Sequence, residues 1–331
     1  MSVQYKLALD VMSGERDPLA SIDAAIEALK NDDALNVFLV GDQSIISEHF
    51  PEELMHRAEI IHTDEVVSMQ ESPVDALRKK KNSSMRLSVN LVSEGKADAC
   101  VSSGNTGALM ANAKYVLKTL PTIDRPAFMK AIPTKGGYTY MLDLGANSTC
   151  TAEQLYQFAL MGNVVAREIK GISSPKVALL NIGEEEIKGH EMIKDASILL
   201  EESPINYVGY IEGNDIVEDK ADVIVTDGFT GNIAIKAMEG TIGLMVSVLK
   251  GSLKNSSDGD SVSNGSQFAL DIFKESIDPR RHNGALLVGL NGIVVKSHGS
   301  SDSYGHYHAI LTAVDEVKKE IIPKMIETFE K

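Results

Sequence analysis

The chain has 331 residues, of which 43% are hydrophobic, and its formal net charge is −15. This charge disfavours a broad surface for nucleic acid or anionic membrane, because both partners need a positive face, and we expect no nucleic-acid partner. The length allows about two domains or one. We expect a single large α/β domain over residues 1–331.

Two cysteines, Cys100 and Cys150, favour a reducing cytosol over a disulfide framework. The N-terminal segment shows no basic stretch followed by an apolar one, and no stretch reaches the roughly 18 uninterrupted apolar residues that span a bilayer. We therefore expect a cytoplasmic protein. His306 and His308 lack further ligands at metal-site spacing, so we expect no metal and no cofactor.

Short apolar, β-branched runs recur along the chain, and most end in a polar, glycine-containing cluster followed by a helical pattern. Strands that are almost continuously apolar are buried on both faces, which predicts a mainly parallel sheet with helices on each side. The alternation of strands and helices predicts an α/β fold. In chain order the runs are "KLALDVMSG", "LNVFLVGD", "ADACVSSGNTG", "YTYMLDLGAN", "KVALLNIGEEE", "NYVGYIEGND" and "ADVIVTDGFTG".

Residues 240–278 predict a projecting helical hairpin. Two segments with helix-like apolar spacing flank a polar stretch, residues 255–267, which predicts a flexible tip. The hairpin could be a dimer arm, a surface decoration, or an apolar edge for a partner or a membrane surface. The apolar residues of its first limb are Leu244, Val248, Leu249 and Leu253.

The last apolar runs of the chain predict an antiparallel pair of strands. They lie on either side of Asn291-Gly292 in "GALLVGLNGIVVKSHG". Asn-Gly is a strong hairpin signal, because both residues tolerate the backbone conformation that a tight turn requires.

Five of the predicted strands end in polar loops. Ligands of open parallel sheets bind beyond the carboxyl ends of the strands, so we expect these loops to meet at one edge of one sheet. Their N–H groups, hydroxyls and carboxamides suit phosphate or another oxyanion. No Walker motif and no G-x-G-x-x-G occurs, which disfavours nucleotide binding. The loops are residues 102–106, 143–147, 181–184, 227–232 and 298–301.

Cations and nucleophiles are scarce in these loops. We expect Lys188 to share a helical face with Glu184, and Lys236 to stand one turn beyond Asn232, although either lysine could be an ordinary surface ion pair. Cys150 follows the second loop without an evident histidine base, so thiolate catalysis is not favoured.

One basic stretch, "RKKKNSSMR", contrasts with the negative net charge. It fits either a solvated helix face or a strip that attracts an acidic partner. Its basic residues are Arg78, Lys79, Lys80, Lys81 and Arg86.

The motifs "SSGNTGALM", "DLGAN", "LLNIGEEEIKG", "DGFTGN" and "VVKSHGSSD" occur in this order. With "LALDVMSG", "DALRKKKNSSM", "RPAF", "QFALMG" and "IEGNDI", they resemble the bacterial phosphate acyltransferases of phospholipid synthesis, or acyl-ACP:phosphate acyltransferases. The resemblance covers nearly the whole chain. It departs in the first motif, where Ser13 and Glu15 replace a glycine and an aspartate of the family's "ALDAMGGD".

The resemblance implies a three-layer αβα fold, akin to phosphotransacetylases and isopropylmalate-type dehydrogenases, and usually a homodimer. It implies transfer of a fatty acyl group from acyl carrier protein (ACP) to inorganic phosphate. The acyl-phosphate then passes to a membrane glycerol-3-phosphate acyltransferase. Because ACP is strongly acidic, a local basic strip would have to overcome the overall repulsion.

This chemistry needs positioning and oxyanion stabilisation, because the thioester is already electrophilic and phosphate is itself the nucleophile. We assign Lys188 and Asn232 to face the carbonyl or the transferring phosphate. A phosphate cradle at a helix N-terminus is assigned to Ser103, Gly104, Asn105 and Thr106. The further residues expected to bind substrate or orient the loops are Asp143, Asn147, Asn181, Asp227, Thr230 and His298.

Three alternatives stay open. A phosphotransacetylase would use short-chain acyl-CoA and would not need a long apolar channel. An isopropylmalate-type dehydrogenase would need a carboxylate set for Mg²⁺ and an arginine-rich clamp, and the sequence shows neither cluster. A non-enzymatic scaffold would bind phosphate without forming acyl-phosphate.

Overall fold

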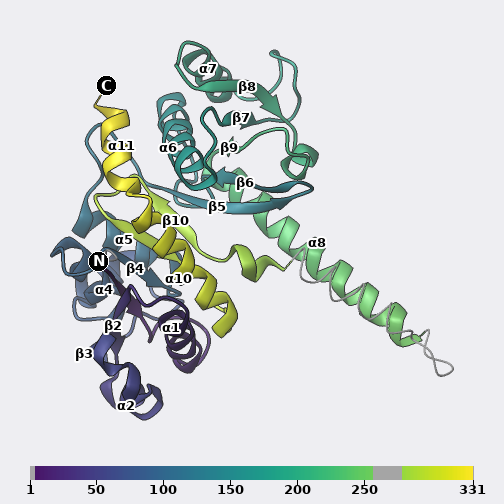
Figure 1. The fold of residues 1–331 in the computed structure, drawn as a ribbon. Helices are drawn as coiled ribbons and strands as arrows, with labels where there is room; N and C mark the ends of the chain where they lie inside the picture. Colours follow the sequence, from purple (N-terminus) through teal and green to yellow (C-terminus); the bar gives the residue numbers. More distant parts are fainter. Residues whose placement is uncertain (1–3, 256–277, 331) are drawn as a thin grey trace.

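One sheet of eleven strands extends through the protein (Figure 1). The computed structural model describes residues 4–255 and 278–330. The strand order is β3-β2-β1-β4-β11-β10-β5-β6-β9-β7-β8. The strands are β1 (Tyr5–Asp10), β2 (Leu35–Gly41), β3 (Ala58–His62), β4 (Ala99–Ser102), β5 (Ala127–Thr134), β6 (Gly137–Leu142), β7 (Lys176–Leu180), β8 (Asn206–Ile211), β9 (Val223–Val225), β10 (Ala285–Val288) and β11 (Ile293–Lys296).

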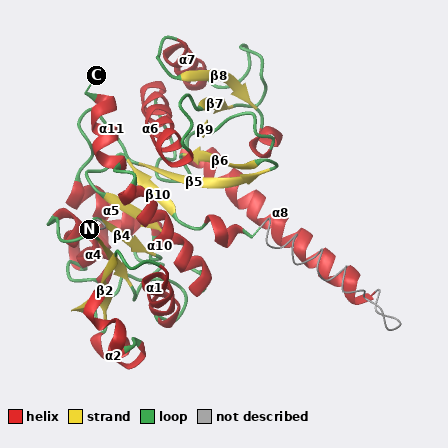
Figure 2. Ribbon diagram, viewed as in Figure 1, coloured by secondary structure: helices red, strands yellow, loops and turns green. Residues whose placement is uncertain are grey.

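Helices cover both faces of this mostly parallel sheet, which confirms the predicted α/β fold with a helical layer on each side (Figure 2). The helices are α1 (Leu19–Asn31), α2 (Gln43–His49), α3 (Pro73–Lys79), α4 (Ser84–Ser93), α5 (Thr106–Leu117), α6 (Ala152–Lys170), α7 (Glu191–Glu201), α8 (Gly228–Asn255), α10 (Ser303–Lys318) and α11 (Ile321–Phe329), with 3-10 turns η1 (Glu52–Arg57), η2 (Gly213–Val217) and η3 (Pro279–His282).

The apolar runs expected to be strands all form strands, namely β1, β2, β4, β6, β7, β8 and β9. The antiparallel pair around Asn291-Gly292 is also confirmed, as β10 and β11. Two further strands were not expected. In β5, Lys130 and Pro133 interrupt the apolar pattern, and β3 lies at a sheet edge where none of its residues is fully buried.

The sheet changes direction at its centre. β1 to β4 and β11 form one parallel set, and β6 to β9 form another. β10 and β5 lie between the sets in antiparallel pairings, and the tight turn at Lys135-Gly136 reverses the chain from β5 into β6. The prediction that five loops leave one sheet edge is therefore wrong. The loops after β4 and β11 leave one edge, and those after β6, β7 and β9 leave the other.

Three clusters of buried apolar side chains hold the layers together. The largest lies between one face of the sheet and α1, α6, α7, α10 and α11. On the opposite face, α3, α4 and α5 cover the first strand set, whereas the first turns of α8 cover the second. Leu144 touches both of these smaller clusters. A cleft lies between them, over β10 and β5.

The helix α8 runs unbroken from Gly228 to Asn255 and projects away from the sheet (Figure 1). The predicted insertion limit at residue 240 falls inside this continuous helix, just beyond Met238, the last α8 residue of the apolar cluster on the sheet. Residues 256–277 of the predicted hairpin, and the Leu253 side chain, lie outside the described part of the structure. By length and composition alone, the segment Gly228–Leu249, with mean hydropathy 1.3, could cross a membrane, and one such helix is a weak indication.

Glu316 of α10 carries a buried carboxyl group, 3% exposed, whose Oε2 has no hydrogen-bond partner. Burial, with a smaller contribution from Asp315, raises the pKa of Glu316 to about 8. A glutamate in the unfolded chain has a pKa of about 4.3. The folded protein therefore binds an extra proton between these values, so stability falls as the pH rises through this window.

We predict that Glu316→Gln raises the melting temperature of the protein at pH 9 and changes it little at pH 4.5. At high pH the variant removes a buried unsatisfied charge, which should raise the free energy of unfolding by about 1–3 kcal/mol. Thermal unfolding at the two pH values measures it, and Glu327→Gln at an exposed position of α11 is the control. An equal effect of Glu316→Gln at both pH values would contradict the assignment.

Candidate active site

The cleft between α5 and α8 brings together residues from both halves of the sheet. We call it the seam cleft. Its polar lining holds three lysines against one glutamate, so it is a positively charged site in a negatively charged protein. It continues past His298 toward Arg16 and the loop 300–302. Its lining includes Thr106 of α5, Phe128 and Lys130 of β5, Ile235, Lys236 and Glu239 of α8, and Lys296, Ser297 and His298 at the end of β11.

A row of polar residues crosses the ends of three neighbouring strands beside this cleft. Asp10, Ser102 and Lys296 lie opposite one another in β1, β4 and β11. The Ser102 hydroxyl donates to Asp10 Oδ2 at 2.6 Å. Burial raises the pKa of Asp10, and its hydrogen bonds to hydroxyl groups, chiefly that of Ser102, oppose the rise. The row therefore places a buried carboxyl and a buried amine at the same level of the sheet.

The other charges of the cleft face one another across it. Lys130 Nζ lies 3.3 Å from Glu239 Oε1, which joins β5 to α8. Burial lowers the pKa of His298, and the nearby Lys296, Lys130 and Lys236 add to this effect against Glu239. His298 is therefore uncharged at neutral pH, and the positive charge of the cleft comes from its lysines.

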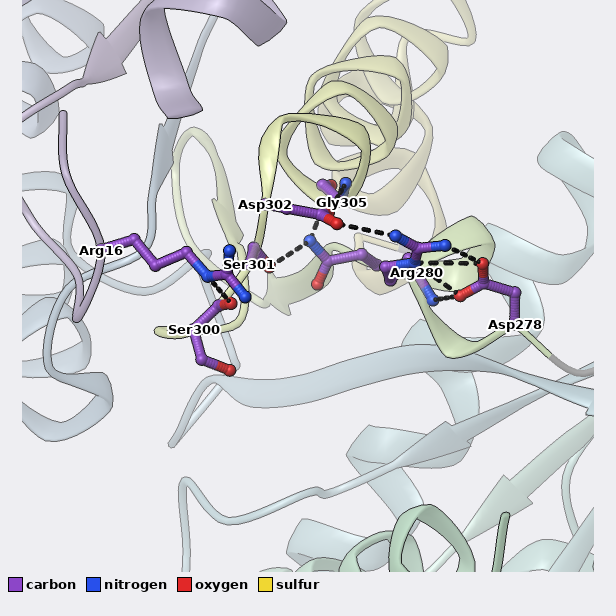
Figure 3. A network of polar contacts seen from close by, with 8 residues as sticks. Arg16, Asp278, Arg280, Ser300, Ser301, Asp302 and Gly305 are labelled. Carbon is purple, nitrogen blue, oxygen red and sulfur yellow. Dashed lines mark hydrogen bonds and ion pairs between the residues drawn. The ribbon is translucent and has the colours of Figure 1, made fainter. Parts of the chain in front are cut away.

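A polar network fixes the loop that carries His298 (Figure 3). Arg280 Nη2 and Nε donate to the Asp278 carboxylate at 2.6–3.0 Å, and Arg280 Nη1 donates to Asp302 at 2.6 Å. The Asp302 carboxylate also accepts from the Gly305 N–H at 3.0 Å and so caps α10. These bonds tie η3, which precedes β10, to Asp302, where the loop after β11 ends and α10 begins.

Arg16 and Asn283 hold the same loop from its two sides. Arg16 Nε donates to the Ser300 carbonyl at 2.7 Å. Asn283 Oδ1 accepts from the His298 N–H at 3.1 Å, and its Nδ2 donates to Ser301 Oγ at 3.0 Å. His298 Nδ1 lies 2.9 Å from Ser300 Oγ. The imidazole is thus held in a fixed position at the cleft wall.

Most of the predicted phosphate cradle holds its own loop. Ser103 Oγ donates to the Ser13 carbonyl, and the Gly104 N–H donates to Ser102 Oγ at 3.2 Å. Asn105 caps α5, since its Oδ1 accepts from the Ala108 N–H at 3.0 Å, and its Nδ2 donates to the carbonyls of Met69 and Glu71. Within the predicted cradle, Thr106 at the start of α5 is the residue that lines the seam cleft.

The loop after β6 is built around Asp143. Its carboxylate accepts from the N–H groups of Phe128, Ala146 and Asn147, and from Asn147 Nδ2, at 2.7–3.1 Å. Burial raises the pKa of Asp143, and these bonds oppose the rise. Asn232 lies against this loop, because a Cβ on Gly145 would stand 3.6 Å from its side chain.

The first turn of α8 is closed by Asp227. Its Oδ1 accepts from the N–H groups of Phe229 and Thr230, both at 2.9 Å, and its Oδ2 accepts from the Thr230 hydroxyl. Asp227 and Thr230 therefore hold the helix start that carries Asn232.

The loop after β7 lies apart from the seam cleft, since none of the cleft-lining residues belongs to it. Asn181 Nδ2 closes the loop by donating to the carbonyls of Gly183 and Lys188. Lys188 Nζ lies 2.7 Å from Glu185 Oε2, while Glu184 pairs with Lys220. The predicted helical pairing of Lys188 with Glu184 is wrong, because residues 181–190 form turns and bends.

The predicted basic strip divides into two parts. Arg78 and Lys79 end α3, and Lys79 pairs with Asp75 at 2.6 Å, while Lys80 and Lys81 follow the helix. Arg86 turns inward, where its Nη1 donates to Asn112 Oδ1 at 3.0 Å and its guanidinium lies over the Tyr115 ring. The outward-facing part of the strip is residues 78–81.

Thiolate chemistry has no support at either cysteine. Burial raises the pKa of Cys150 to about 12 and that of Cys100 further. Both side chains are therefore thiols at neutral pH. Across the described residues, no three His, Cys, Asp or Glu side chains gather as metal ligands.

Sequence reasoning missed Lys130 and Lys296. Each is the lysine of an otherwise apolar strand, in "AFMKAIP" and "GIVVKSHG". A charged residue inside a run that is buried on both faces is costly, and this cost was the available signal. The prediction rested on the loops that follow the strands, and neither lysine lies in one of them.

The sequence is similar to known families over almost its full length. A family model described as "Fatty acid synthesis protein" matches residues 5–324. The chain is 49% identical to a phosphate acyltransferase of Alkalilimnicola ehrlichii, covering 99% of this chain and 96% of the relative. It is 47% identical to a phosphate acyltransferase of Methylococcus capsulatus, covering 95% of this chain and 94% of the relative.

Solved structures share the fold. The EutD phosphotransacetylase from Staphylococcus aureus superposes with a TM-score of 0.59 at 17% identity, covering 96% of this chain and 94% of that one. A branched-chain phosphotransacylase from Enterococcus faecalis superposes with a TM-score of 0.61 at 14% identity, covering 94% of this chain and 99% of that one. At these identities the likeness shows a phosphotransacetylase-like fold and no more.

Proposed function

Because the chain belongs to the family of phosphate acyltransferases, and is therefore an acyltransferase, we propose that it transfers a fatty acyl group from ACP to inorganic phosphate. The product is an acyl-phosphate, which a membrane glycerol-3-phosphate acyltransferase consumes in phospholipid synthesis. The observation that carries the proposal is the seam cleft, whose lysines and helix N-terminus suit a phosphate dianion.

The reaction needs no nucleophilic side chain. A phosphate oxygen attacks the thioester carbonyl, and the carbonyl oxygen becomes an oxyanion. When the tetrahedral intermediate collapses, the C–S bond breaks, and the released thiolate of ACP takes up the proton that the attacking phosphate loses. A thiol with a pKa of about 8.5 is a good leaving group, so positioning and charge stabilisation are the remaining tasks.

The proposed roles follow the placement of the residues. Thr106 and the start of α5 receive the phosphate, and Ser103 to Asn105 hold that helix start in place. Asn232, beside the β6 loop, donates to the carbonyl oxygen, and Lys188 neutralises the charge that develops there. Because the attacked carbonyl lies beside the phosphate, this role requires the β7 loop, where Lys188 is now paired with Glu185, to bring Lys188 to the seam cleft.

We predict that long-chain acyl-ACP and phosphate yield acyl-phosphate on the order of 100-fold faster than acetyl-CoA and phosphate, and that Lys188→Ala slows the first reaction by a similar factor. Trapping the product with hydroxylamine measures both rates. The Lys188 side chain is 42% exposed, so the variant should keep its melting temperature, and Lys194→Ala on α7 is the control.

Other outcomes would overturn parts of the proposal. Faster turnover of acetyl-CoA would identify a short-chain phosphotransacetylase. Phosphate binding without any acyl-phosphate would point to a binding scaffold. A folded and fully active Lys188→Ala protein would remove Lys188 from the site.

We propose that the acidic ACP docks on the basic strip of residues 78–81, on the face that also carries α5. The triple variant K79E/K80E/K81E should raise the KM for acyl-ACP about tenfold at low salt, and the difference should shrink as salt screens the charges. Lys30→Glu on α1, which packs on the opposite face, is the control. An unchanged KM with persisting salt dependence would place the docking site elsewhere.

We also propose a cytoplasmic homodimer that contacts the membrane peripherally through α8, because Leu244, Val248 and Leu249 are 64%, 57% and 36% exposed. Leu244→Glu should release the protein from liposomes while acyl transfer survives. Flotation with liposomes measures binding, and sedimentation measures the oligomer. Binding that persists in the variant would reject this surface, and a monomeric wild-type protein would reject the dimer.

A further inference from the structure

Lys296 is a buried lysine at the last position of β11. Its side chain is 8% exposed. Its Nζ donates to the Ser103 carbonyl at 3.3 Å and to the Ser297 carbonyl. One bond reaches the loop after β4 and the other stays in the loop after β11, so the ammonium group lies where these two loops meet beside the seam cleft.

The fold gains little from this charge. Among the described residues, Lys296 forms no ion pair, and the Oδ2 of its row neighbour Asp10 already accepts from Ser102. Burial lowers the pKa of Lys296 to about 8 despite the attraction of Glu15 and Asp10. An unpaired buried ammonium costs stability, and an apolar side chain would complete the strand better. A residue that breaks the rules of core packing in this way is typical of a functional site.

The seam cleft supplies the reason for a cation at this place. Lys296 lines it together with Lys236 of α8 and Thr106, the first residue of α5. The two lysines repel each other, and this repulsion adds to the lowered pKa of Lys296. Thr106 also brings the start of α5, the positive end of that helix's dipole, to the cleft. Two like charges beside a helix N-terminus favour a bound anion of high charge.

We propose that Lys296 is the residue that binds inorganic phosphate in the seam cleft, with Lys236 opposite and the start of α5 as the third contact. The inference rests on the proposed function, because phosphate is the co-substrate of that reaction. In this assignment the phosphate contacts Lys296, on a strand of the first half of the sheet, and Lys236, on the helix that covers the second half. Binding of phosphate would thereby join the two halves across the seam.

The test compares two buried lysines in the full-length protein. Lys296→Met should raise the KM for phosphate roughly tenfold to 100-fold, the loss expected for a charge-assisted hydrogen bond, and leave the KM for the acyl donor within a factor of about two. Its melting temperature should equal or exceed that of the wild type. Lys296→Arg, which keeps the charge, should recover part of the phosphate affinity.

Lys170 is the matched control. It is also largely buried, but it pairs with Asp222 at 2.8 Å and does not line the seam cleft. Lys170→Met should therefore lower the melting temperature and leave the KM for phosphate unchanged. This pattern is the opposite of the one expected for Lys296→Met.

Two results would overturn the inference. An unchanged KM for phosphate in Lys296→Met would exclude the contact, and a fall in melting temperature equal to that of Lys170→Met, with both KM values raised together, would show a structural role. Titration calorimetry with inorganic phosphate tests the Lys296 contact separately from the proposed reaction. A wild-type protein that binds phosphate through Lys296 but makes no acyl-phosphate refutes the reaction and keeps the site.

Discussion

The hairpin between β5 and β6 divides the sheet into two halves, because it reverses the strand direction in the middle of the sheet. Each half of the sheet then has its own set of parallel strands and its own helices on the cleft face, α3 to α5 on one half and α8 on the other. On the central strands, Phe128 of β5 and Leu287 of β10 belong to the apolar cluster under α3 to α5, and Ile132 of β5 belongs to the one under α8. The seam cleft is the space that this division leaves, and it lies within reach of residues from both halves.

The charges of the molecule are distributed to suit this cleft. The protein as a whole carries −15, yet the cleft gathers Lys130, Lys236 and Lys296 around Glu239. Low-dielectric walls strengthen the attraction between such lysines and an anion, whereas the distant surface carboxylates are screened by solvent and salt. A reaction whose nucleophile is an anion and whose intermediate is an oxyanion gains from this arrangement. It does not depend on a reactive cysteine or serine.

The sequence predicted the buried strands, which depend on local pattern. It did not predict which sheet edge each loop leaves, because this depends on the direction of the strands. Apolar runs such as "KVALLN" identify buried strands whatever their neighbours are. β5 was missed because Lys130 and Pro133 interrupt its pattern, and without β5 the reversal of the sheet could not be inferred. The helical pairing of Lys188 failed because Gly183 and Gly189 close a compact loop around Asn181. Of the predicted site residues, Thr106 and His298 line the seam cleft, and the others hold loops or lie outside it.

The central claim is that the seam cleft is the phosphate site. A crystal structure of the full-length protein grown with inorganic phosphate, compared with crystals grown without it, tests this most directly. The account predicts phosphate within hydrogen-bond distance of Lys296 Nζ and of the N–H groups at the start of α5. Phosphate bound beside Lys188 on the β7 loop, with the seam cleft holding none, would contradict it.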